Sequence, residues 1–110
     1  MPHIIVEHTD LSAHSVDINT LNKNLHDCLS KQESVSLDAI KTRSIEVKNV
    51  YVGGRNEKNF IHVTVLLLAG RPKWLKETMA EALHVCAQSH LTNIECRVSV
   101  NIEELGVYKK

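Results

Sequence analysis

The chain has 110 residues, the length of one small domain, and we expect residues 1–110 to form a single folded unit. Its 13 basic residues are balanced by 13 acidic ones, and neither sign forms a long block. This balance argues against nucleic-acid binding and against a polybasic membrane-binding patch, since both depend on concentrated positive charge. The three cysteines, an odd number without paired spacing, argue against a disulfide framework.

No segment of the sequence has the length and polarity expected of a membrane span. The longest apolar run, from Val63 to Ala69, is far shorter than the roughly 20 residues that cross a bilayer. The first residues, Met1 to Glu7, lack the positive charge and long apolar stretch of a signal peptide. We therefore expect a cytoplasmic protein.

The first half of the chain predicts a strand, a helix and a second strand. Consecutive β-branched residues favour a short buried strand near the start. Apolar residues that recur every three or four positions then predict a helix, with a capping side chain in front of it. The expected elements are a strand over 3–6, a helix capped by Ser15 or Asp17 with Ile18, Leu21, Leu25, Cys28 and Leu29 on one face, and a strand region over 40–52 with Arg43, Ile45 and Val47 on one face.

The second half repeats this order of elements after two glycines at 53–54 and a polar turn. The segment 60–68 is the most apolar of the chain and predicts a central strand. Pro72 suits the first position of a helix, where its missing N–H costs nothing, and the helical pattern continues to Leu91. Strict alternation of apolar and polar residues over 94–103 predicts the last strand.

The predicted order βαββαβ fits an α+β fold with one four-stranded sheet and two helices on one face. Each strand–helix–strand unit is expected to be right-handed with parallel strands. On the central strand, Val63, Val65 and Leu67 would share one face while Leu66 and Leu68 lie on the other, so both faces need to be covered. Because the helices cover only one face, we expect a second subunit to cover the other.

Pro2 directly follows the initiator methionine, which is generally removed when the next residue is small. Removal would leave a secondary amine at the start of a buried strand. Burial and nearby cations both lower the pKa of an amine from its ordinary value of about 7.7–8.0, so the amine can act as a general base near neutral pH. The alternative is that Pro2 is only a tolerated second residue.

Three segments of the chain together carry a family resemblance. They are Pro-His-Ile-Ile-Val-Glu at 2–7 followed by Thr9-Asp10, Phe-Ile-His-Val-Thr at 60–64 with Ala-Gly-Arg at 69–71, and Ile-Glu-Glu-Leu at 102–105. In this order and spacing, the chain from its start to about Leu105 resembles the 5-carboxymethyl-2-hydroxymuconate isomerase family, a branch of the tautomerase superfamily. The helical regions between these segments match only in their pattern.

The resemblance implies a tautomerase-like βαββαβ fold that assembles as a homotrimer around facing sheets. It also implies an isomerase of aromatic-compound catabolism that uses no metal and no organic cofactor. In such an isomerase the terminal proline removes a proton from a 2-hydroxy-dienoate and returns it at a distant carbon, which gives the 2-oxo isomer. By the same resemblance, Pro2 is the catalytic base, and Arg71, Lys41 and Arg43 hold the carboxylates of a small-molecule substrate.

The chemistry of these side chains agrees in part with the implied roles. Arg71 offers a fork that binds a carboxylate at two points, and a helix that starts at Pro72 favours an anion nearby. The alternative interpretation of Arg71 is a solvent-exposed residue at the start of the helix, without a binding role. At Lys41 the chain departs from the family, whose isomerases typically carry arginine there, and lysine supplies charge without the planar grip. The tail after Leu105 is short for the family, so we expect it to add less to the pocket.

Two other classes of function stay open. A tautomerase-fold protein without turnover would bind a small acid or a protein partner, and a ferredoxin-like sensing domain has the same order of elements. Cys86 and His90, four residues apart on a helix, are expected to be a core cysteine and a partly buried histidine rather than metal ligands. We expect His62 to be a hydrogen-bonded structural histidine.

Overall fold

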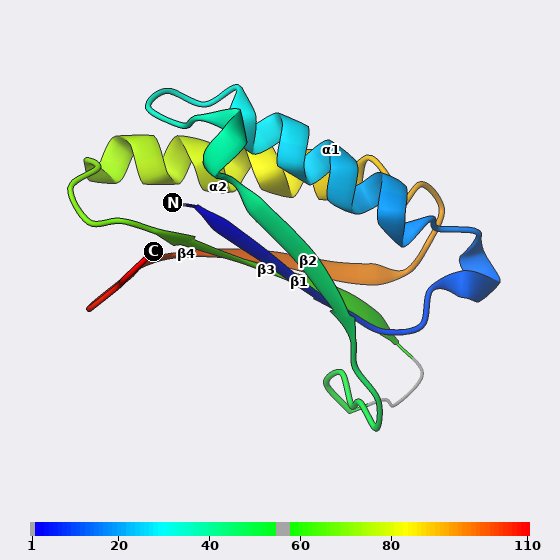
Figure 1. The fold of residues 1–110 in the computed structure, drawn as a ribbon. Coiled ribbons are helices and arrows are strands. Elements are labelled where there is room, and N and C mark those ends of the chain that lie inside the picture. Colours follow the sequence, from blue (N-terminus) through cyan, green and yellow to red (C-terminus); the bar gives the residue numbers. More distant parts are fainter. Residues whose placement is uncertain (1, 55–57) are drawn as a thin grey trace.

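The computed structural model describes residues 2–54 and 58–110, which form one sheet with two helices packed on it (Figure 1). Both helices lie on the same side of the sheet, as the sequence predicts. In chain order the elements are β1 (His3–His8), the short 3-10 turn η1 (Ser12–His14), α1 (Ile18–Ser30), the turn η2 (Leu37–Ala39), β2 (Lys41–Glu46), β3 (Asn59–Leu67), α2 (Lys73–Gln88) and β4 (Cys96–Glu104).

The strands lie in the order β2-β1-β3-β4. β1 pairs with β2 in parallel and β3 pairs with β4 in parallel, which confirms the two predicted strand–helix–strand units. β1 and β3 join these units by antiparallel pairing, so that His3 lies opposite Lys41 on one side and Leu66 on the other. The register therefore brings the start of β1, the start of β2 and the end of β3 to the same end of the sheet.

The hydrophobic core lies between the sheet and the two helices. Along β1 and β3 every second side chain is buried, which is the period expected of a strand with one covered face. Each helix buries residues four positions apart, so each presents one apolar stripe to the sheet. The fully buried side chains include Ile4, Val6, Leu21, Leu25, Leu29, Ile61, Val63, Val65, Leu67, Met79 and Leu83.

Helix α1 begins where the sequence predicts a cap. The Asp17 carboxylate accepts hydrogen bonds from the backbone N–H of Asn19 and from the Thr20 hydroxyl, at 3.0 and 2.9 Å. An acceptor at this position satisfies one of the backbone donors that the first helical turn leaves unpaired. Ser15, the other predicted cap, lies before the helix in the left-handed backbone region at φ 59°.

Two predicted boundaries differ from the structure. The second strand ends at Glu46 rather than near residue 52, because β1 ends at His8 and the chain turns at Asn49, whose φ is +57°. Helix α2 ends at Gln88 rather than at Leu91, and it begins one residue after Pro72, whose extended backbone makes it the cap. The polar turn predicted after the two glycines includes residues 55–57, which lie outside the described residues.

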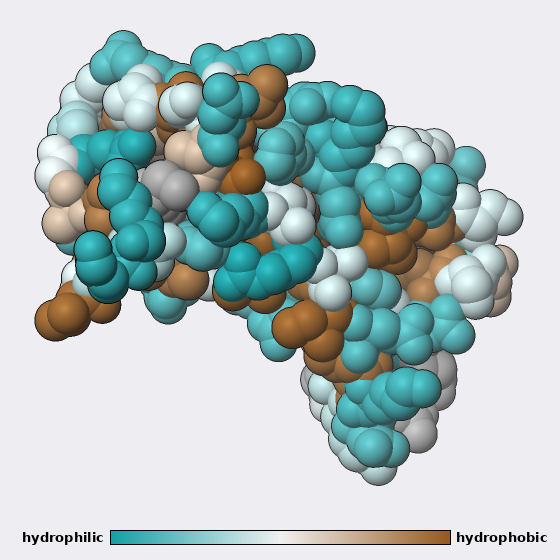
Figure 2. Space-filling view, viewed as in Figure 1, coloured by the Kyte–Doolittle hydropathy of each residue, from teal (hydrophilic) through white to brown (hydrophobic). Residues whose placement is uncertain are grey.

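The second face of the sheet carries no helix among the described residues, as the sequence predicts. Leu66 is half-buried there, and Leu68 and Ile45 are exposed, with 38% and 53% of their surface accessible. Figure 2 shows hydrophobic and hydrophilic surface intermixed where β2 ends. We call this second face of the sheet, which carries Leu66, Leu68 and Ile45, the open face.

The remaining general features agree with a small globular chain. All three cysteines are free and partly buried. Within residues 2–54 and 58–110, neither helix is long and apolar enough to cross a membrane.

The burial pattern of α2 predicts how two nearby substitutions differ. Leu83→Ala removes a fully buried side chain and should lower the free energy of unfolding by about 2–5 kcal/mol. Val85→Ala, two residues along the same helix at a site 58% exposed, should change it by less than about 0.5 kcal/mol. Urea denaturation followed by circular dichroism measures both, and equal effects would contradict this assignment of the core.

Candidate active site

The predicted site residues lie near one end of the sheet, where β1 and β2 begin and β3 and β4 end. The backbone N–H of Lys41 donates to the carbonyl of Pro2 at 3.0 Å, which joins the starts of β1 and β2. The backbone N–H of Leu105 donates to the carbonyl of Leu67 at 2.7 Å, which joins the ends of β3 and β4. Arg71 follows β3 by four residues. The fold therefore gathers positions 2, 41 and 71 at the same end.

Pro2 is buried directly before β1. Burial alternates along this segment, so Pro2 shares the helix-facing side with Ile4 while His3 turns to the open face. His3 and Pro2 therefore point in opposite directions. Met1 lies outside the described residues.

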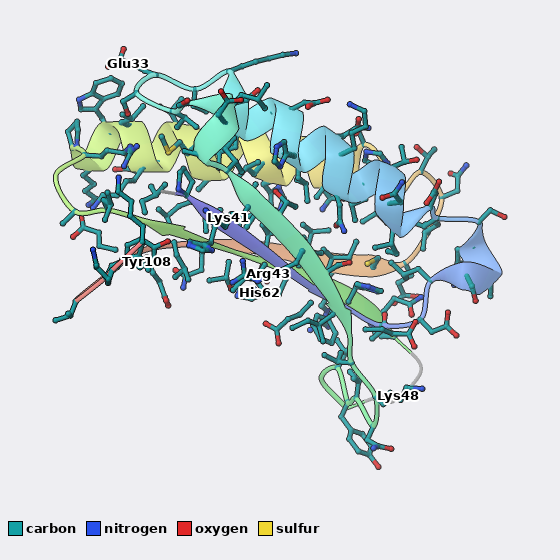
Figure 3. All side chains as sticks on the ribbon, viewed as in Figure 1. Glu33, Lys41, Arg43, Lys48, His62 and Tyr108 are labelled. Atoms are coloured by element: carbon teal, nitrogen blue, oxygen red, sulfur yellow. The ribbon has the colours of Figure 1, made fainter. Side chains whose placement is uncertain are left out.

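Lys41 and Arg43 stand two residues apart on β2, and both are exposed on the open face (Figure 3). Arg43 does not project freely, because its Nη1 lies 3.0 Å from His3 Nδ1. Arginine can only donate hydrogen bonds, so His3 Nδ1 accepts and its proton resides on Nε2. The structure thus places Arg43 against His3, one strand away, while Lys41 begins β2 beside Pro2.

His3 connects this pair to the C-terminal tail. Its Nε2 donates to the Tyr108 hydroxyl at 2.8 Å, and the two rings meet edge to face with centroids 5.6 Å apart. Burial, then the charges of Arg43 and Lys41, lower the pKa of His3 below its ordinary value of 6.5. The ring is therefore neutral near pH 7, which matches the accepting role of Nδ1.

Arg71 is held by the loop between α1 and β2. Its Nε donates to the Ser34 hydroxyl and its Nη2 donates to the Ser34 carbonyl, both at 3.0 Å. A third, longer bond of 3.4 Å joins Nη1 to the Leu68 carbonyl. Arg71 is half-buried rather than free in solvent, so its guanidinium has a fixed position at this end of the sheet.

Two residues of this region were not predicted from the sequence. Ser34 lies in a loop whose composition gives no functional signal, and its contact with Arg71 arises only in the folded chain. Tyr108 belongs to the tail that we expected to contribute little, yet it contacts His3 across a separation of 105 residues. The sequence has only two tyrosines and few aromatic residues, and this rarity is the one feature of the sequence that could have drawn attention to Tyr108.

The other candidate groups have structural partners. His90 lies beyond the end of α2 and its Nε2 contacts Asn24 Nδ2 at 3.0 Å, and His62 Nδ1 contacts the Ser99 hydroxyl at 2.6 Å. Burial raises the pKa of all three cysteine thiols, which disfavours the reactive thiolate. Within the part of the chain that the structure describes, no group of three or more histidine, cysteine or acidic side chains could hold a metal ion.

Comparison with known families bears on this arrangement. The family model described as 5-carboxymethyl-2-hydroxymuconate isomerase matches residues 2–105, nearly the whole chain. The chain belongs to this family. Membership identifies it as an isomerase of the tautomerase superfamily, as the sequence segments predicted. No curated protein sequence matches the chain.

Solved structures share the fold at low sequence identity. A 5-carboxymethyl-2-hydroxymuconate isomerase from Deinococcus radiodurans R1 superposes with a TM-score of 0.86 at 23% identity, covering 99% of this chain and 88% of that one. A 5-carboxymethyl-2-hydroxymuconate delta-isomerase gives 0.81 at 12% identity, with coverage of 100% and 87%. A fused 4-OT described as a symmetric trimer gives 0.75 at 16% identity, with coverage of 94% and 87%. These likenesses confirm the tautomerase fold rather than the ferredoxin-like alternative.

The Arg43–His3 contact predicts the titration of His3. Arg43→Gln removes a neighbouring positive charge, so it should raise the pKa of His3 toward 6.5. In the parent, the His3 imidazole takes up a proton more readily in the unfolded chain than in the folded one. The contribution of neutral His3 to stability is therefore complete above pH 6.5 and declines as the pH falls below it. Imidazole titration by NMR measures the pKa, with His3→Gln to assign the signal. An unchanged titration in Arg43→Gln would contradict the electrostatic contact.

Proposed function

We propose that this isomerase is a cofactor-free keto–enol tautomerase that acts on a 2-hydroxy-dienoate resembling 5-carboxymethyl-2-hydroxymuconate, with the Pro2 amine as general base. The observation that carries the proposal is the burial of Pro2 at the end of the sheet where Lys41 and Arg71 also lie. Pro2 faces the helices and Lys41 faces the open face, so an anionic substrate held by Lys41 would reach the terminal amine around the end of β1 rather than across one face of the sheet.

The environment of Pro2 suits a base that is neutral near pH 7. A terminal amine ordinarily titrates near about 7.7–8.0. Burial disfavours its charged form, and so do the positive charges that the same end of the sheet carries at Lys41 and Arg71. Both effects act in one direction, so a trimmed Pro2 would be largely unprotonated and ready to accept a proton.

The reaction moves one proton and needs no oxidant or metal. The Pro2 nitrogen takes the proton of the 2-hydroxyl group, and the oxygen becomes a carbonyl as the double bonds shift along the chain. The same nitrogen returns the proton to the distant carbon of the dienoate, which restores the free base. Arg71 would hold one carboxylate by two hydrogen bonds, and Lys41 would hold a second by charge. Arg43 would supply further positive charge from the open face.

We also propose that the open face is covered in a homotrimer. The face retains half-buried Leu66 and exposed Ile45 and Leu68, which another copy would remove from water. Fused 4-OT structures with this fold are described as symmetric trimers. In such an assembly Lys41 and Arg43 would lie close to a neighbouring subunit, so the site would be completed by a second chain.

A second candidate function is binding of a small acid without turnover. It is favoured by Lys41, which supplies charge where isomerases of the family typically carry arginine but lacks the planar two-point grip. Such a protein would bind carboxylates through Arg71 and Lys41 but would not depend on the Pro2 amine. The role of that amine therefore distinguishes the two functions.

The test follows the ultraviolet absorbance of 2-hydroxymuconate-type dienols with protein whose intact mass confirms loss of Met1. The parent should accelerate ketonisation, and Pro2→Ala should lower kcat/KM by about 10²–10⁴-fold, the usual contribution of a positioned base. Alanine is also small, so Met1 is removed from the variant as well and a terminal amine remains.

The same experiment separates the two candidate functions. Ketonisation by the parent that is lost in Pro2→Ala supports the tautomerase. A Met-free parent that binds these acids but does not accelerate ketonisation would exclude the proposed activity and favour the binding protein.

Assembly is tested by light scattering after size-exclusion chromatography. The parent should have three times the chain mass of 12.4 kDa. Leu66→Glu places a charge on the open face near the end of β3 and should shift the protein to the monomer, because an unpaired buried carboxylate is costly. Val85→Glu, on the outward side of α2, is the matched control and should leave the mass unchanged. A monomeric parent would overturn the trimer.

A further inference from the structure

The α1–β2 loop determines which part of the Arg71 guanidinium is free. Ser34 supplies two acceptors to this one side chain, its hydroxyl to Nε and its backbone carbonyl to Nη2, both at 3.0 Å. Nε–H and the adjacent Nη2–H form one edge of the planar fork, the edge on which arginine commonly receives a carboxylate side-on. Ser34 therefore occupies the position that a ligand would otherwise take on that edge.

The backbone of Ser34 is unusual in a way that makes this double contact possible. Its φ is +69°, in the left-handed region that residues other than glycine, asparagine and aspartate seldom adopt. In this conformation its carbonyl and hydroxyl oxygens both reach the same guanidinium. Sparsely populated backbone conformations persist where surrounding contacts hold them, and they concentrate at functional sites.

Counting donors shows what Arg71 still offers. A guanidinium has five N–H donors, and the bonds to Ser34 and Leu68 engage one on each of Nε, Nη1 and Nη2. One donor is left on Nη1 and one on Nη2. Two donors on the two terminal nitrogens match the two oxygens of one carboxylate. With Nε and one N–H of Nη2 occupied by Ser34, these two terminal N–H groups are what Arg71 has left for a carboxylate.

We propose that Ser34 is a positioning residue that presets Arg71 for end-on binding of one substrate carboxylate. The proposal rests on the proposed function, since it takes the carboxylate to be that of the dienoate. Ser34 blocks the side-on edge, holds the guanidinium in place before substrate arrives, and so reduces the freedom that Arg71 loses on binding. The loop continues through buried Ile40 to Lys41, so the segment that orients Arg71 also leads into the second cation.

The kinetic test uses two variants of Ser34 and a control from the same loop. Ser34→Ala and Ser34→Gly both remove the hydroxyl acceptor, but only glycine relaxes the left-handed backbone. Both should raise KM about three- to tenfold with kcat changed less than about twofold, since a lost hydrogen bond to a charged group weakens substrate binding. Ser36→Ala removes a hydroxyl that makes no cap hydrogen bond and should leave KM unchanged.

A double-mutant cycle shows whether Ser34 acts through Arg71. In an Arg71→Ala background, Ser34→Ala should raise KM by less than about twofold further, because the group that it positions is absent. A general effect of the loop on stability would instead give the same increment in both backgrounds. Equal increments, or an unchanged KM in both Ser34 variants, would overturn the proposal.

Binding of muconate, a non-enolic dicarboxylate, gives a readout that does not depend on turnover. Calorimetric titration of the parent should give a dissociation constant that Ser34→Ala and Arg71→Ala each raise, with no further rise when both are combined. If dienols are not ketonised but this pattern holds, the proposed function fails and the role of Ser34 stands. If muconate does not bind the parent, or binds the parent and Ser34→Ala equally, the role of Ser34 is refuted even if ketonisation is observed.

Discussion

The antiparallel pairing of β1 with β3 joins two parallel strand–helix–strand units, and this pairing determines where the chemistry lies. Parallel pairing aligns the starts of β1 and β2, and antiparallel pairing sets the end of β3 beside them. The first residues of the chain thereby lie beside Lys41, at the end of the sheet from which the chain continues to Arg71. A register shift of one residue would turn every side chain of β1 to the other face and would move Pro2 out of its buried position.

Positive charge at this end of the sheet is organised rather than simply concentrated. The chain has no net charge, yet Lys41, Arg43 and Arg71 lie near the end of the sheet where β1 begins. Each arginine is oriented by a neutral partner, His3 for one and Ser34 for the other, and neither forms an ion pair with a described residue. Carboxylate partners would have neutralised these cations. Neutral partners fix the geometry and preserve the attraction for an anion.

The sequence was sufficient to predict the elements that depend on local periodicity. Alternation along 94–103 and helical spacing after Asp17 reflect a single buried face, so they identified β4 and α1 to within a few residues. The length of β2 could not be predicted, because its end is set by the end of the neighbouring β1 and by a left-handed Asn49.

For the candidate site, family motifs located Pro2, Lys41, Arg43 and Arg71, and the fold brings them to one region. Their partners could not be found in the same way. Ser34 contributes a backbone carbonyl, which any residue carries, and its effect depends on a rare φ angle. Tyr108 is placed by a tail contact with no periodic signal. Contacts that depend on the backbone or on distant segments leave no pattern along the chain.

The bond between the Pro2 carbonyl and the Lys41 amide has a consequence for how the chain is made. β1 leaves the ribosome first, yet it acquires its parallel neighbour only after residue 46 and its antiparallel neighbour only after residue 67. At usual rates of synthesis this interval lasts on the order of several seconds. Throughout this interval β1 has no neighbouring strand to pair with, so position 2 is open to processing enzymes before folding buries it. Because β1 lies in the middle of the sheet, position 2 is exposed during synthesis before it is buried, and under the proposed function this is the interval in which Met1 would be removed.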